Sequence, residues 1–279
     1  MNKKYLVIFL AILLVCMVSV TAALSQRSPT VCNGQWTSCS NGNANDANRA
    51  TFTATSTLNG TGAWKTYGFA LQNGAIITDV LVQADFFASN SRGFLDVKVS
   101  GNNGTTYGPS HVVGGNTAEQ TFNISVTSDL SWTPSMLNNG NFRVNATCFK
   151  SPTGGPNPTC NLDWIPVTVT YTPFDYSLAV SPANVNVTQG NNATTTVTAT
   201  LVSGNSQTVA LSYSGCPTNA VCSFVSSSGT PTFSSDFIVQ TSLGNGSNSS
   251  STPLGTYVIA LNSFGDGVAR SQNYTLNVQ

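Results

Sequence analysis

The chain has 279 residues and a formal net charge of zero. Only 7% of its residues are charged, against about 25% in an ordinary soluble protein. Ten basic and ten acidic residues balance without any Lys/Arg cluster, which excludes nucleic acid as a partner. The single histidine, His111, excludes histidine-rich metal sites.

The first 23 residues have the organisation of a secretory signal peptide. Lys3 and Lys4 precede an apolar stretch over 6–20, and the small residues of 21–23 follow as a cleavage site. We therefore predict a hydrophobic leader helix over 1–23 and an extracellular or cell-surface protein. The same stretch just reaches the ~20 residues that span a bilayer. An uncleaved anchor is thus the alternative, and membrane contact is expected only there.

Nine asparagines lie in the acceptor sequon for N-linked sugar, Asn-x-Ser/Thr without proline at x. They are Asn59, Asn103, Asn123, Asn145, Asn186, Asn192, Asn245, Asn248 and Asn273. Because charge is so scarce, we expect glycan at these sites to supply the hydration that ionised side chains supply in other proteins.

Six cysteines follow the leader and fall in three close pairs. Because the chain is predicted to be exported, we interpret these pairs as disulfides and not as ligands of a zinc site. The pairs are Cys32 with Cys39, Cys148 with Cys160, and Cys216 with Cys222. The spacing predicts local bridges that staple loops. Each would contribute at most about 2–3 kcal/mol through chain entropy.

Apolar and polar residues alternate along both halves of the exported part, which is the period of a β-strand. Phe122, Ile124 and Val126, for example, alternate with Thr121, the sequon residue Asn123 and Ser125. Since a glycan must face water, the sugar pattern and the apolar pattern assign the same strand face to solvent. Further strands are predicted over 76–87, 94–99, 167–171, 194–201, 209–213, 237–241 and 257–261.

These short strands are separated by Gly, Asn, Ser and Pro clusters, and no helical period lies between them. The pattern predicts an all-β fold with two antiparallel β-sandwich domains after the leader helix. Pro173 marks the joint, so the domains are expected over 24–172 and 173–279. Each is long enough to bury its own core.

The second predicted domain resembles the immunoglobulin-like modules repeated in secreted archaeal and bacterial surface proteins. The resemblance is carried by Ser181-Pro182, Val187-Thr-Gln-Gly190, Val209-Ala-Leu-Ser-Tyr-Ser-Gly215, Cys222-Ser-Phe224 and Gly255-Thr-Tyr-Val-Ile-Ala-Leu261. It implies a sandwich that acts as a spacer or adhesive module, without catalytic residues. Cys216 and Cys222 depart from the inter-sheet bridge of antibody domains, because they can only staple a loop.

The first predicted domain is similar to a β-sandwich found in phage virion and microbial extracellular proteins. The similar stretches are Trp132-Thr-Pro134, Asn139-Gly-Asn-Phe142-Arg-Val144 and Asp163-Trp-Ile-Pro-Val-Thr-Val-Thr-Tyr171. This resemblance implies a structural role or a role in attachment.

The sequence carries no recognisable catalytic set. No Gly-x-Ser-x-Gly elbow surrounds any serine, and a triad would have to use His111. We therefore predict no enzyme activity, no catalytic residue and no cofactor. The stretch over 41–46 alternates oxygen-bearing residues as a calcium loop does, but only Asp46 is charged and the closing Glu is missing. A plain polar loop and no metal are predicted.

Four tryptophans invite a second interpretation as a sugar-stacking platform, although core packing is favoured. They are Trp36, Trp64, Trp132 and Trp164. Trp164 is expected in the core. Trp36, in a loop bounded by cysteines, is the one most open to a surface role.

The sequence thus predicts a glycosylated cell-surface protein with a structural or adhesive role. Its partners would be surface proteins, glycans or copies of itself. One alternative is a subunit of an extracellular thread or pilus, in which the polar tail over 25–31 adds as a strand to a neighbour's sheet edge. Another is a carbohydrate-binding module that uses Trp36.

Overall fold

The structure is a computed structural model that describes residues 21–243 and 250–279. The predicted leader, except its last three residues, lies outside these ranges. The described residues form strands and two short 3-10 helices, η1 (Cys39–Gly42) and η2 (Pro134–Leu137), which confirms the all-β class. No helix within them is long and apolar enough to cross a membrane.

Residues up to Thr172 form two sheets. The first sheet has the order β1 (Ala23–Arg27), β11 (Val167–Thr172), β5 (Ile76–Ala88), β10 (Thr159–Trp164) and β3 (Ala50–Thr53), with β8 (Gln120–Ser125) also paired to β5. The second has the order β2 (Val31–Gly34), β4 (Gly60–Lys65), β9 (Arg143–Lys150), β6 (Gly93–Ser100) and β7 (His111–Gly114).

Residues from Asp175 onward form two further sheets and a small two-stranded one. The first has the order β12 (Asp175–Ser181), β14 (Asn192–Ser203), β18 (Phe233–Gln240) and β16 (Val221–Phe224). The second has the order β13 (Asn184–Val187), β22 (Val268–Val278), β21 (Gly255–Gly265), β15 (Val209–Ser214) and β17 (Ser228–Gly229). The short pair is β19 (Ser242–Leu243) with β20 (Ser250–Ser251).

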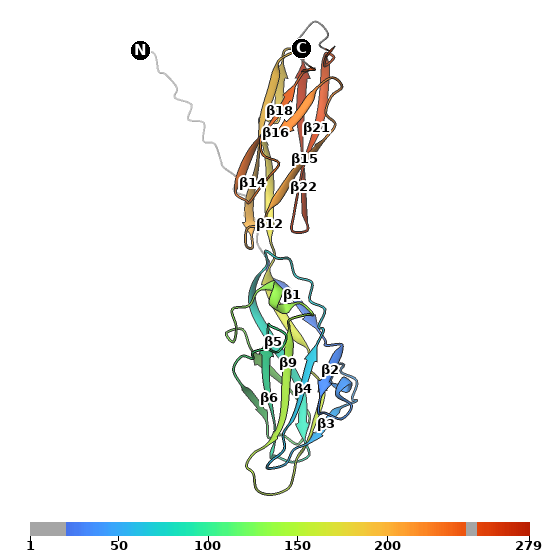
Figure 1. Cartoon of the computed structure of the whole chain (residues 1–279), viewed down its shortest axis with the longest axis vertical. Coiled ribbons are helices and arrows are strands. Elements are labelled where there is room, and N and C mark those ends of the chain that lie inside the picture. The colour runs from blue at the N-terminus through green and yellow to red at the C-terminus, as the bar shows by residue number, and fades with distance from the viewer. Residues whose placement is uncertain (1–20, 244–249) are drawn as a thin grey trace, which may run out of the picture.

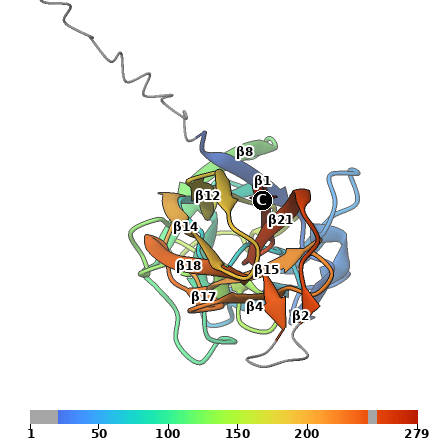
Figure 2. The ribbon, with the colours of Figure 1, turned by 90° about the horizontal axis from the view of Figure 1, so that it is seen from above.

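The two larger sheets of this second region face each other: seen along the long axis, β12, β14 and β18 lie on one side and β15 and β21 on the other (Figure 2). One feature departs from the predicted antiparallel pattern, because β13 pairs with β22 in parallel. All other ladders between the described strands of both regions are antiparallel.

The buried apolar side chains form two clusters, one drawn from 36–169 and the other from 174–278. The predicted boundary at 172/173 falls between them, and a count of two domains stays a prediction. In β8 and the residue after it, Ile124 and Val126 are buried while Asn123 and Ser125 are exposed. The strand parity inferred from alternation is therefore confirmed there.

We use "first region" for residues 21–172 and "second region" for 173–279. The strands of the first region lie at one end of the elongated molecule and those of the second at the other, with the C-terminus at the far tip (Figure 1).

Hydrogen bonds join the two regions at the β21–β22 turn. The Asp266 carboxylate there accepts the backbone N–H groups of Asn73 at 3.2 Å and Gly74 at 2.8 Å. Gly74 also accepts the N–H of Asn205 at 2.7 Å. A Cβ at position 74 would lie 2.6 Å from the Asn205 carbonyl oxygen, so only glycine permits this contact.

The polar tail that could have extended outward is paired within its own chain. Strand β1 lies antiparallel to β11 over five residue pairs, from Ala23 opposite Tyr171 to Arg27 opposite Val167. It forms one outer edge of the first sheet. Residue Ala23, the last of the predicted leader, already belongs to this strand.

Candidate functional site

The sequon asparagines are distributed over the outer surface of both regions. Seven of the nine lie in the described ranges, and of these six are exposed and Asn145 is half-buried. Asn245 and Asn248 lie outside the described residues. Each asparagine of the seven thus presents a side chain to solvent.

The hydrogen bonds of these side chains leave their amide nitrogens free. Four sequon asparagines accept through Oδ1: Asn103 from Arg143, Asn123 from Gln83 at 3.1 Å, Asn145 from Thr147 at 3.2 Å, and Asn186 from Asn277 at 3.0 Å. None of the seven described sequon residues donates through Nδ2, whereas eight other asparagines of the described chain do.

This pattern suits an N-linked sugar, which replaces a hydrogen on Nδ2 and leaves Oδ1 as an acceptor. Holding the oxygen orients the amide, and the unbonded nitrogen is where the sugar attaches. Attachment would therefore break no hydrogen bond within the described protein. Whether these sites carry glycan stays a prediction.

Asn145 is the most constrained of the set. It lies on β9, the central strand of its sheet, between Ala63 of β4 and Lys98 of β6. Neighbouring side chains on both sides leave it half-buried. A glycan attached at Asn145 would therefore have less free space around it than a glycan at any of the six exposed positions.

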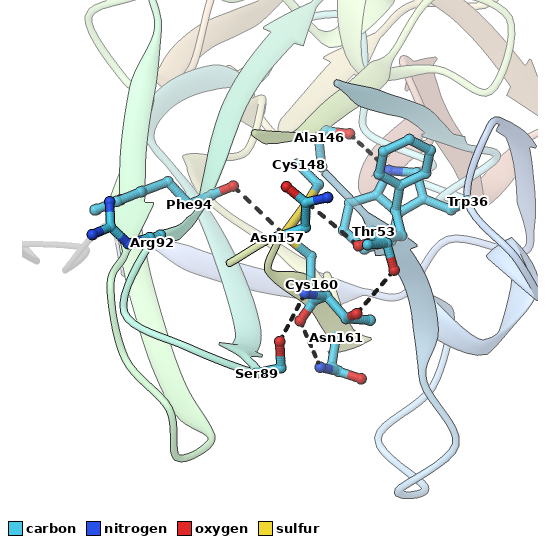
Figure 3. Close-up of a disulfide and its surroundings, with 12 residues drawn as sticks. Trp36, Thr53, Ser89, Arg92, Phe94, Ala146, Cys148, Asn157, Cys160 and Asn161 are labelled. Atoms are coloured by element: carbon cyan, nitrogen blue, oxygen red, sulfur yellow. Dashed lines mark hydrogen bonds between the residues drawn. A yellow bond between two sulfur atoms is a disulfide. The ribbon is translucent and has the colours of Figure 1, made fainter. Parts of the chain in front are cut away.

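The cysteines pair as predicted, and one bridge has a different role from the expected one. Cys32–Cys39 and Cys216–Cys222 staple loops. The Cys148–Cys160 bridge instead joins β9 of one sheet to β10 of the other, and both cysteines are fully buried (Figure 3). The loop-staple interpretation of this pair is wrong, because its two strands lie in opposite sheets and the bridge crosses the core.

The tryptophans offer no exposed platform within the described chain. Trp36 is only 4% exposed, packs edge-on against Trp64, and donates from Nε1 to the Ala146 carbonyl at 3.3 Å (Figure 3). The suggested surface role of Trp36 is therefore wrong. Trp132 and Trp164 are half-buried, and Trp164 donates to the Ser28 hydroxyl at 2.9 Å. Trp164 thus lies nearer the surface than a core position would place it.

His111 has an acidic partner but no nucleophile. Its Nε2 lies 2.8 Å from Oδ2 of the buried Asp129 carboxylate. The adjacent Ser110 hydroxyl donates to Asp96 and not to the imidazole. Among the described residues, no serine or cysteine hydrogen bonds to His111, so this pair fastens β7 to the loop after β8. The absence of enzyme activity stays a prediction.

Within 21–243 and 250–279, no group of three or more His, Cys, Asp or Glu residues is placed to hold a metal ion. The predicted polar loop over 41–46 is present and begins in η1, just after the Cys32–Cys39 bridge. An isolated bridge between Asn43 and Trp164 holds it against β10.

No protein-family description and no curated protein matches the chain. Among solved structures, domains 4 and 5 of the S-layer protein SbsC are similar at 15% identity and a TM-score of 0.29, covering 83% of this chain and 96% of that one. A β-1,2-glucanase from Parabacteroides distasonis is similar at 10% identity and a TM-score of 0.33, over 92% of this chain and 36% of its own.

The fibronectin(III)-like modules of Clostridium thermocellum CbhA are similar at 11% identity and a TM-score of 0.23, over 82% of this chain and 94% of theirs. TM-scores this low carry no inference about function, which therefore has to come from the residues of the chain itself.

Proposed function

We propose that this chain is an exported, N-glycosylated cell-surface protein with a structural or adhesive role and no catalysis. The observation that carries the proposal is the outward set of sequon asparagines with free amide nitrogens. Three disulfides and a coat of neutral Ser, Thr and Asn side chains suit the same compartment. With few charges to hold it in solution, such a surface depends on attached sugar.

The test is site-resolved mass analysis of the protein made in a host with N-linked glycosylation. Ser125→Ala removes the Asn123 sequon while keeping the asparagine, and we expect the loss of one glycan. Thr121→Ala is the matched control, since Thr121 lies on the same exposed face of β8 but in no sequon. Full occupancy elsewhere and reduced occupancy at the half-buried Asn145 are expected.

Solubility gives the second readout. Replacing the described sequon asparagines by glutamine together should lower the concentration at which the protein stays monodisperse. A protein that leaves the glycosylating host at its bare polypeptide mass and remains soluble would overturn the proposal.

A second candidate, assembly into an extracellular thread, is favoured by the position of β1. This strand is the outermost of its sheet, holds only β11, and carries the exposed Leu24. An edge strand can be exchanged between copies at little cost, because the same ladder forms with a neighbour's β11. Copies linked this way would form an open chain.

Deletion of residues 24–27 tests this candidate. The exchange predicts filaments in negative-stain images of the intact protein and none in the deletion variant. The variant Gln26→Ala, which removes only the 2.7 Å side-chain bond to Gln83, should still form them. Filaments that persist without the strand would rule the exchange out.

A further inference from the structure

Two acidic side chains of the first region are buried without a cationic partner. Asp85 of β5 is 7% exposed and Asp163 of β10 is 3% exposed. One carboxylate oxygen of each, Oδ1, is completely buried and has no hydrogen-bond partner among the described residues. Neither residue takes part in any of the ion pairs found there.

The sheet register brings both carboxylates beneath one loop. Asp85 lies opposite Trp164, and a β-bulge between Leu162 and Trp164 inserts Asp163 beside that pair. The loop over 41–49 covers this place: Asn45 donates from Nδ2 to Asp85 Oδ2 at 3.5 Å, and Asn43 bridges Trp164.

The same loop contributes a third unpartnered acceptor. Oδ1 of Asn43 is also buried and has no hydrogen-bond partner in the described chain. The loop is well fixed, because Asn41 donates from Nδ2 to the Arg49 carbonyl at 3.3 Å and the N–H of Asn48 bonds Asp46 at 3.0 Å. Three buried acceptor oxygens without a partner therefore belong to this loop and to the two strands beneath it.

Arg49 is the basic side chain that acts on Asp163; its terminal nitrogens are engaged elsewhere, and its buried Nε has no hydrogen-bond partner in the described chain. Arg49 donates from Nη2 to Glu119 at 2.7 Å and from Nη1 to the Ala47 carbonyl at 3.0 Å. Burial raises the pKa of the Asp163 carboxyl, repulsion from Glu119 raises it further, and the Ala47 amide, Arg49 and the Asp46 amide oppose the rise. A buried carboxylate oxygen without a partner is costly. Oδ1 of Asp85 and Oδ1 of Asp163 both remain in that state, so a bound cation would stabilise them.

We propose that Asp85, Asp163 and Asn43 bind a calcium-class divalent cation beneath the 41–49 loop. Carboxylate and amide oxygens are the ligands that hard cations prefer, and the absence of His and Cys among these three residues disfavours zinc and copper. Backbone carbonyls of the loop and water would complete the six to eight ligands that calcium takes.

Binding to Ca²⁺ is tested on the purified full-length protein by calorimetry, and binding to Tb³⁺ by luminescence. Trp164 lies next to Asp163 in the chain and opposite Asp85 in the ladder, so it should sensitise Tb³⁺ emission. We expect Ca²⁺ to compete for the Tb³⁺ signal. Trp164→Phe should lose most of the emission while keeping the calorimetric binding.

Asp163→Asn and Asp85→Asn should each weaken Ca²⁺ binding by at least the roughly tenfold that loss of a supporting group costs at metal sites. Asp46→Asn is the matched control, since it removes the same charge from the loop that covers the site, at an exposed carboxylate that already has a partner. If Asp46→Asn weakened Ca²⁺ binding equally, the effect of the other two substitutions would come from the loss of local charge alone. That result would overturn the assignment of Asp85 and Asp163 as ligands.

The wild-type protein decides the question even if the variants fold poorly. Ca²⁺ should raise its melting temperature and EDTA should lower it, with little effect of Mg²⁺ at equal concentration. A wild type with no heat of Ca²⁺ binding, no sensitised Tb³⁺ emission and no change in melting temperature would show that a proton, and not a metal, neutralises this place.

Discussion

The two regions differ in their numbers of charged residues and of N-linked glycosylation sequons. The first region holds 14 of the 20 charged residues and four of the nine sequons, whereas the shorter second region holds four charged residues and five sequons. Charge is thus rarest where sequons are densest. The proposed glycans would therefore hydrate mainly the region that has the fewest charged side chains.

Buried polar chemistry is divided just as unevenly. The first region buries Asp85, Asp163 and Lys150 and carries a disulfide across its core, while the buried polar residues in the described part of the second are Thr and Ser. The first region therefore depends on specific buried interactions. The second depends on apolar packing under a neutral coat, and paired substitutions can test this contrast.

The largest expected difference concerns the disulfides. Replacing both Cys148 and Cys160 by alanine should cost about 3–5 kcal/mol of unfolding free energy, and replacing Cys216 and Cys222 about 2 kcal/mol. The loop lengths, 12 and 6 residues, differ too little in closure entropy to explain this gap, since a doubling is worth about 0.6 kcal/mol. The remainder comes from two fully buried sulfurs that join opposite sheets.

Equilibrium denaturation of the two double variants under oxidising conditions measures both losses. Equal losses of unfolding free energy would mean that a bridge across the core stabilises the protein no more than a bridge that only closes a loop. The bridge would then be only a third staple.

Most strands could be predicted from alternation, because a one-sided sheet requires apolar residues at every second position. The expected strand over 76–87 is β5, and those over 194–201 and 257–261 are the middles of β14 and β21. The outward direction of the sequon asparagines followed from the same parity. Strand order, and the parallel pairing of β13, carry no such local signal.

The candidate cation site could not be predicted, because its parts are far apart in the sequence. The loop over 41–46 was recognisable by its oxygen-rich residues but has only one carboxylate of its own, Asp46. Asp85 and Asp163 reach it only through the β5–β10 register and a bulge. Trp36 was misplaced for a similar reason, since the short loop between cysteines folds back over the core.

A pair of tyrosines provides the next comparison. Tyr67 in the first region donates its buried hydroxyl to the Ile165 carbonyl at 3.1 Å, whereas the buried hydroxyl of Tyr274 in the second has no partner in the described chain. Tyr67→Phe should therefore cost about 1–2 kcal/mol of unfolding free energy. Tyr274→Phe should be neutral or slightly stabilising. Thermal denaturation of both variants measures the contrast, and a larger loss in Tyr274→Phe would contradict it.

The same two residues predict a loss of stability at alkaline pH. Burial raises the pKa of Tyr274 to about 12 and that of Tyr67 well above its ordinary value. An acid whose pKa is raised by folding stabilises the native state fully below its unfolded pKa, about 10 for tyrosine. That contribution is lost as pH rises from about 10 toward the folded values. The free energy of unfolding should fall over this range, and fall less in the double Phe variant.

The smallest effect is expected at the contact between the regions. Asp266→Ala removes the acceptor for the backbone N–H groups of Asn73 and Gly74 and should broaden the distribution of interatomic distances in small-angle X-ray scattering. Asp266→Asn keeps one acceptor oxygen and tolerates the left-handed φ of 44° at this position, so it should broaden the distribution less.

Asp236→Ala controls for the loss of charge, because that carboxylate bonds Thr196 within its own sheet at 2.8 Å. Its scattering should match that of the wild type. If all three variants scatter alike, the Asp266 bonds contribute nothing to the alignment of the two regions. The covalent junction at 172/173, the packing of Phe174 and the backbone bond from Asn205 to Gly74 would then hold the regions in line.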